Sequence, residues 1–161
     1  MQNFEHLIDK NKYQVFIFSS PSPIPLCFAR HTWFVVNKMG TLDRYEIFHK
    51  KDAKSPNPAC ANNGYLYKNY FAPFQGIEMF FYDEQRFWDA HFECELKGDQ
   101  DLIKKVVATI EDSFANYPYT NKYNLLGPNS NSYPMWILNK FPEIKVRLPY
   151  NAVGKNFFKR Q

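Results

Sequence analysis

Three apolar segments in the first third of the chain have the composition of adjacent β-strands. Tyr13–Ser19 is β-branched and aromatic, which is typical of a buried strand. Through Leu26–Asn37, successive side chains are predicted to face opposite sides of a strand, and Leu42–His49 is predicted to be the return strand. The turn-forming Lys38-Met39-Gly40 lies between these last two runs. The pattern therefore predicts a β-hairpin over 26–49, in addition to the strand over 13–19.

Helical periodicity appears only in the second half of the chain. Apolar residues recur every four positions from Leu102 to Phe114, and Asp99 stands where an N-cap is expected. A second helix is predicted over Asn131–Lys140, because Pro134 is tolerated only in a first helical turn. The helix start therefore falls near Ser130, with Asn129, Ser130 or Asn131 as its N-cap.

The remaining segments complete an α+β pattern. Three prolines make Ser20–Pro25 an extended loop, and Lys50–Asn63 is a polar loop. Tyr65–Lys97 is aromatic and is predicted to hold two or three strands, the last over Arg86–Leu96. No linker divides the chain, so residues 1–161 are predicted to form a single domain with an antiparallel sheet and packed helices.

Composition narrows the function classes. The chain is 45% hydrophobic and carries a net charge of +4 from scattered charged residues, so nucleic-acid binding is not expected. It has no secretory signal and no apolar stretch long enough to span a membrane, which favours a cytoplasmic protein, with signal-less export left open. Three cysteines without close spacing predict reduced, mostly buried thiols and no metal site.

Ser130 lies in the most informative segment, Tyr123-Asn-Leu-Leu-Gly-Pro-Asn-Ser-Asn-Ser-Tyr133. A serine at a helix start has unpaired backbone donors beside it, which favour developing negative charge. It could serve as a nucleophile if another part of the fold supplied a base. Capping alone also explains a run of Asn and Ser at this position.

A base is available in the predicted hairpin. His31 leads one strand, and Glu46 lies on the return strand, where it could orient the imidazole by a hydrogen bond. The alternatives are a satisfied core histidine and an ion pair between Glu46 and Arg44.

Several motifs resemble an uncharacterised bacterial family, domain of unknown function 3750. The similarity covers about residues 27–158 and is carried by His31-Thr-Trp33, Arg44-Tyr-Glu46, Gly127-Pro-Asn-Ser-Asn-Ser-Tyr133 and Ala152-Val-Gly-Lys-Asn-Phe157. Apolar residues in the segment 148–158 predict that this tail packs back on the domain, with Lys155 near the Ser130 cleft or bonded to a carboxylate.

A more distant resemblance is to the circularly permuted branch of the NlpC-like papain-fold superfamily. There a histidine strand comes first, and a Tyr-x-Leu-Leu-x-x-Asn-Cys-x-x-Phe segment opens the nucleophile helix. The segment 123–133 is similar to it, with serine in the cysteine position. The resemblance implies a permuted papain-like architecture in which Ser130 is the nucleophile, His31 the base and Glu46 the orienting residue.

Two main hypotheses follow, with a scaffold lacking any small-molecule site as a third. The first is a hydrolase or acyltransferase acting on an amide or ester, in which His31 and Ser130 come within hydrogen-bond reach. The second is a non-catalytic binding module that keeps the cleft around these residues for a small molecule or peptide. Neither requires a cofactor or metal. The residues expected to contact a ligand are Asn129, Asn131, Trp33 and Lys155.

Overall fold

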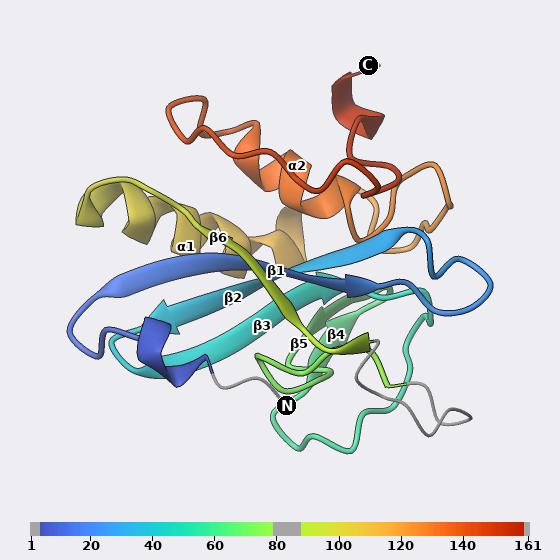
Figure 1. Cartoon of the computed structure of the whole chain (residues 1–161), viewed down its shortest axis with the longest axis horizontal. Coiled ribbons are helices and arrows are strands. Elements are labelled where there is room, and N and C mark those ends of the chain that lie inside the picture. The colour runs from blue at the N-terminus through green and yellow to red at the C-terminus, as the bar shows by residue number, and fades with distance from the viewer. Residues whose placement is uncertain (1–3, 79–87, 160–161) are drawn as a thin grey trace.

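The computed structural model describes residues 4–78 and 88–159 and has an antiparallel sheet at its centre (Figure 1). The sheet order is β4-β5-β3-β2-β1-β6, and every neighbouring pair is antiparallel. This confirms the predicted α+β class. The strands are β1 Tyr13–Pro21, β2 Arg30–Lys38, β3 Thr41–Ile47, β4 Ala61–Asn63, β5 Leu66–Lys68 and β6 His91–Glu95. The helices are α1 Gln100–Asn116 and α2 Ser132–Leu138, with short 3-10 turns at Glu5–Leu7 and Phe157–Lys159.

The predicted hairpin is present and its register is fixed by a tight turn. Lys38 pairs with Thr41, which leaves Met39 and Gly40 as a two-residue loop. Both have positive φ, 52° and 95°, as a turn that matches the twist of a hairpin requires. The same register places Arg44 opposite Val35, on the sheet face that also carries Trp33 and His31.

Because successive side chains of a strand face opposite sides, the sheet carries one apolar cluster on each face. One face of the sheet, with Val15, Ile17, Phe34 and Val36, packs against α1, α2 and the C-terminal segment, and Figure 1 shows both helices on this side. The opposite face carries a smaller aromatic cluster built on Phe16, Phe18 and Trp33. The candidate site lies at the Arg30 end of β2, where His31 is the second residue of the strand.

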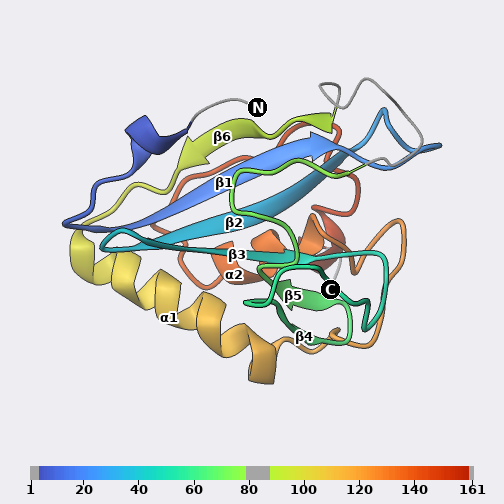
Figure 2. The same cartoon turned by 90° about the horizontal axis from the view of Figure 1, so that it is seen from below.

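Helix α1 follows the predicted pattern. The Asp99 side chain accepts a hydrogen bond from the backbone N–H of Leu102 at 2.8 Å and caps the helix. The face it buries includes Ile103, Val106 and Ile110. Figure 2, a view from below, shows α1 running beside the sheet. No helix among the described residues is long and apolar enough to cross a membrane.

The C-terminal segment packs back on the domain, as predicted. Leu148 and Ala152 are buried within the helix-side core. Gly154 has a φ of 91°, and a Cβ there would come within 2.3 Å of the Asn129 side chain. The close approach therefore requires glycine and fixes the tail against the start of α2.

Several expected boundaries were wrong. Strand β1 runs to Pro21, so the loop expected over Ser20–Pro25 starts at Ser22, and helix α2 covers only Ser132–Leu138 of the expected 131–140. The second strand begins at Arg30, because residues 26–29 form a turn whose backbone bonds to 22–23 and to itself. The segment predicted as a polar loop over 50–63 ends in strand β4. Of the strand predicted over 86–96, residues 91–95 form β6, and residues 86–87 lie outside the described residues.

Candidate functional site

His31 and Glu46 form a buried pair at the start of the hairpin. His31 Nε2 lies 2.7 Å from Glu46 Oε2, and the two residues are 4% and 0% exposed. Arg44 pairs with Val35 across the hairpin. Because every second residue of a strand faces the same side, Glu46 and His31 lie on the face that carries Arg44 and Val35. The bond fixes the orientation of the ring. No other hydrogen bond in the described structure engages the imidazole, which leaves Nδ1 as the unbonded nitrogen.

Arg44 completes the buried network. Its Nη2 donates to Glu46 Oε2 at 2.7 Å, so the carboxylate serves both the histidine and the arginine, and the two interpretations of Glu46 hold together. The guanidinium lies 4.0 Å from the centroid of the Trp33 ring. Burial would raise the pKa of Glu46, but the charge of Arg44 and the hydrogen bond from His31 outweigh burial, and the pKa falls below its ordinary value.

Ser130 lies at the other side of the site, in the turn that starts α2. Asn131, the residue directly before α2, makes no side-chain capping bond. Asn129 caps the turn in its place: its Oδ1 accepts from the backbone N–H groups of Asn131 at 2.9 Å and Ser132 at 3.2 Å. Ser130 is 4% exposed, and no hydrogen bond of the described residues engages its hydroxyl. The Ser130 side chain is therefore not the cap.

The Ser130 turn is tied to the strand that carries His31. Asn131 Nδ2 donates to the carbonyls of Arg30 and Val153, both at 2.8 Å, and Thr32 Oγ1 donates to Asn131 Oδ1 at 2.9 Å. Thr32 thus faces α2, while His31 points to the opposite face of the sheet.

A cavity of about 260 Å³ lies at the Arg30 end of β2, and both His31 and Ser130 line it. Its other walls come from the β1–β2 loop, His49, the segment 123–131 and Val153. No hydrogen bond joins His31 to Ser130 in the part of the chain that the structure describes. The structure thus brings the two residues to one cavity without placing them in direct contact.

The expected ligand-contacting residues divide into two groups. Asn129 and Asn131 line the cavity, but their side-chain amides already bond to backbone groups, including the Val153 carbonyl at 3.1 Å and 2.8 Å. Trp33 is fully buried beneath His31, with its Nε1 donating to the Pro73 carbonyl at 3.0 Å. Lys155 Nζ donates to the carbonyls of Pro149 and Tyr150 and does not line this cavity.

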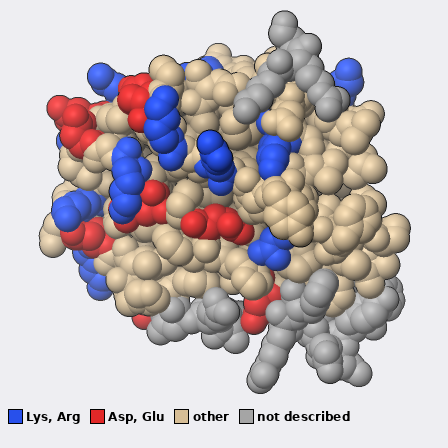
Figure 3. All heavy atoms as spheres, turned by 45° about the horizontal axis from the view of Figure 1, so that its top comes forward, with Lys and Arg blue, Asp and Glu red and all other residues tan. Residues whose placement is uncertain are grey.

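No group of three or more His, Cys, Asp or Glu among the described residues could hold a metal ion. The three cysteines are free and half-buried, where mostly buried thiols were expected, and none lines the cavity. On the face seen in Figure 3, basic and acidic side chains lie side by side, in keeping with the scattered charge of the sequence.

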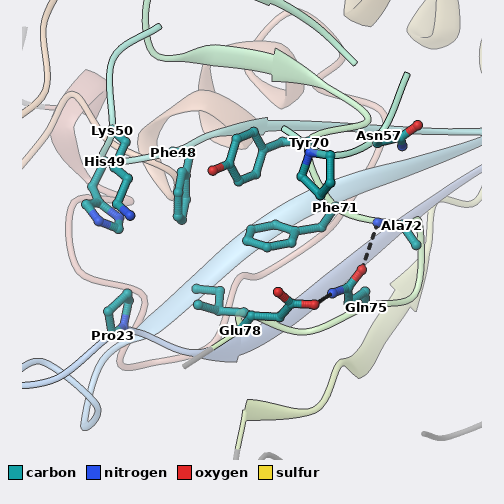
Figure 4. Close-up of a pocket in the computed structure, with 12 residues that line it drawn as sticks. Pro23, Phe48, His49, Lys50, Asn57, Tyr70, Phe71, Ala72, Gln75 and Glu78 are labelled. Carbon is teal, nitrogen blue, oxygen red and sulfur yellow. Dashed lines mark hydrogen bonds between the residues drawn. The ribbon is translucent and has the colours of Figure 1, made fainter. Parts of the chain in front are cut away.

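A second cavity, of about 560 Å³, adjoins the first, and sequence analysis missed it. Pro23 and His49 line both cavities. Its walls come from the strand end at Phe48 and the loops 49–57 and 70–78 (Figure 4). The signal in the sequence was the aromatic pair Tyr70-Phe71, which lies in a segment interpreted only as strand.

A family model described as "Protein of unknown function (DUF3750)" matches residues 12–157. No curated protein and no solved structure matches the chain.

Proposed function

The chain belongs to the DUF3750 family, and from its site we propose that it is a serine-type hydrolase or acyltransferase acting on an amide or ester. The observation that carries the proposal is the buried His31–Glu46 pair at 2.7 Å, whose free ring nitrogen belongs to a residue lining the same cavity as Ser130. Acyl transfer uses a base that a carboxylate holds in one orientation, together with a hydroxyl that has no competing hydrogen bond, and both line this cavity.

In the proposed reaction, Ser130 Oγ attacks the substrate carbonyl carbon while His31 takes the hydroxyl proton. The tetrahedral intermediate collapses, the bond to the leaving group breaks, and His31 returns the proton to the departing amine or alcohol. Water, or an acceptor alcohol or amine, then attacks the acyl-serine carbonyl carbon while His31 takes its proton. The bond from that carbon to Ser130 Oγ breaks, His31 returns the proton to the serine oxygen, and the acid, ester or amide product leaves. Glu46 stabilises the imidazolium that forms in each half-reaction. Catalytic hydrogen bonds are often long in free enzymes and shorten when substrate binds.

Hydrolysis of p-nitrophenyl acetate by matched variants tests the proposal. Ser130→Ala should abolish turnover, whereas Ser22→Ala, which alters another serine of the same cavity, should retain it. His31→Gln should lower kcat by about 100-fold or more, the usual contribution of a general base. His49→Gln is its control, because His49 lines the same cavity but has no carboxylate partner among its described hydrogen bonds. Turnover unchanged in Ser130→Ala would overturn the proposal.

A binding module is the second candidate function, and one observation favours it. His31 and Ser130 are not bonded to each other, and the Ser130 turn contacts the strand through Thr32 Oγ1, 3.2 Å from the Ser130 carbonyl. A module of this kind would bind amides or esters in the cavity around His31 and Ser130 with no acyl-serine forming.

A further inference from the structure

The larger cavity is positioned as part of the candidate site. It shares Pro23 and His49 with the cavity that holds His31 and Ser130. The Phe48 ring, which lines it, meets the His31 ring edge-to-face with centroids 6.2 Å apart. A molecule whose carbonyl lies beside Ser130 would therefore have its neighbouring groups at the entrance to this space.

Aromatic rings form one wall of the cavity. Phe48 lies 5.0 Å from Tyr70 and 5.5 Å from Phe71, measured between ring centroids. Figure 4 shows these three rings next to one another among the lining residues, with His49 and Lys50 to one side and Gln75 and Glu78 beyond Phe71. The lining is thus an apolar surface with polar groups at its margins, as in typical small-molecule sites, and its volume of about 560 Å³ lies within their usual range.

The buried network that orients His31 also holds this wall. Arg44, which shares the Glu46 carboxylate with His31, donates through Nη1 to the backbone carbonyls of Ala72 and Gln75. Its guanidinium lies 5.1 Å from the centroid of the Phe71 ring. Ala72 and Gln75, which Arg44 bonds, both line the cavity, so one hydrogen-bonded network joins the cavity wall to the histidine.

We propose that the larger cavity binds an aromatic group of the substrate, next to the amide or ester that the Ser130 cavity receives. The inference rests on the proposed function for the placement of the carbonyl, and on the cavity alone for the aromatic group. A wall of aromatic rings favours flat aromatic groups, because offset and edge contacts between rings add stabilisation beyond the burial of area. The polar margins suit the amide groups that flank an aromatic residue in a peptide.

Binding without catalysis tests the inference directly. In the Ser130→Ala protein, dissociation constants are measured by NMR titration for the methylamides of N-acetylphenylalanine, N-acetylleucine and N-acetylalanine. The phenylalanine probe should bind at least about tenfold more tightly than the alanine probe, which corresponds to about 1.4 kcal/mol, and more tightly than the leucine probe. Equal affinity for phenylalanine and alanine would overturn the inference. Equal affinity for phenylalanine and leucine would overturn the choice of an aromatic group.

Two variants locate the binding. Ala72→Phe adds a ring to an exposed residue that lines the cavity, and should raise the dissociation constant of the phenylalanine probe about tenfold. Its control, Ala59→Phe, adds the same ring to an exposed residue outside the lining and should have no effect. Tyr70→Leu, which removes one ring of the wall, should also weaken the probe, unlike Tyr150→Leu at a residue that is 92% exposed. Affinity unchanged in both cavity variants would overturn the inference.

The same variants separate this inference from the proposed function. If p-nitrophenyl acetate hydrolysis depends on Ser130 but the phenylalanine probe shows no preference, the cavity assignment fails and the proposed reaction stands. If the probe binds in the larger cavity but turnover survives Ser130→Ala, the reaction fails and the binding site stands.

Discussion

Replacing Arg44 by methionine should be among the most destabilising single changes in this fold. Arg44 is fully buried and supports the Glu46 carboxylate at 2.7 Å, the loop carbonyls of Ala72 and Gln75, and the face of Trp33. Removing one partner of a buried ion pair leaves the other charge uncompensated, which typically costs about 3–5 kcal/mol. At this chain length each kcal/mol shifts Tm by roughly 2–4 °C, so we expect a decrease of about 6–20 °C.

The cause of that loss can be separated from lost packing. The double variant Arg44→Met with Glu46→Gln should be more stable than Arg44→Met alone, because the stranded charge is gone, although Glu46→Gln in the wild type should destabilise. Lys38→Met is the matched control in the same hairpin. Its ion pair with Glu111 is partly exposed on both sides, so the expected change is within about 1 kcal/mol.

The stabilisation that Glu46 supplies should depend on pH in a definite direction. Because the folded-state pKa of Glu46 lies below its unfolded value, the stabilisation it supplies is present above the ordinary carboxyl pKa and is lost as pH falls through the lowered one. The stability difference between wild type and Arg44→Met should therefore be largest near neutral pH and shrink in acid. Urea unfolding followed by tryptophan fluorescence at several pH values measures it. If Arg44→Met lowered the free energy of unfolding by less than about 1 kcal/mol at pH 7, or if the double variant were less stable than Arg44→Met, the reasoning would be refuted.

Three further predictions concern the Ser130 side of the site. Ser130→Cys should create a thiol that iodoacetamide alkylates faster than any of the three native cysteines, because a neighbouring histidine favours thiolate; equal rates would count against His31 acting on this position. Asn129→Ala should lower the free energy of unfolding by about 1–3 kcal/mol in urea titrations, since it removes the cap of α2 and the bond to the Val153 carbonyl; an unchanged midpoint would show that the cap contributes nothing. Deleting residues 148–161 should lower Tm by several degrees, because Leu148 and Ala152 are buried, and an unchanged melting curve would contradict the packing.

Local patterns were enough to predict the frame of the fold. The hairpin follows from alternation on both sides of Met39-Gly40, and α1 follows from its apolar spacing and the Asp99 cap. The start of β2 at Arg30 was not predictable, because residues 26–29, which form a turn, are as apolar as those of the strand. The turn contacts the distant C-terminal segment, where Asn151 Nδ2 donates to the Phe28 carbonyl at 2.8 Å.

The site shows the same division. The pairing of His31 with Glu46 follows from hairpin register, which sequence patterns reach. The role of Asn129 as the cap, in place of Ser130, depends on which side chain the turn directs inward. The aromatic cavity assembles residues from three separate segments around Arg44, and such long-range packing leaves no periodic signal along the chain.

Covalent labelling by a fluorophosphonate tests the central claim most directly, because an activated serine displaces fluoride from phosphorus and keeps the phosphonyl group. Intact-mass analysis and peptide mapping of the full chain should find one adduct, on Ser130, absent in Ser130→Ala and strongly reduced in His31→Gln. The His49→Gln and Ser22→Ala proteins should label as the wild type does. An unlabelled wild-type protein, or an adduct that persists in Ser130→Ala, would contradict the assignment of Ser130 as nucleophile.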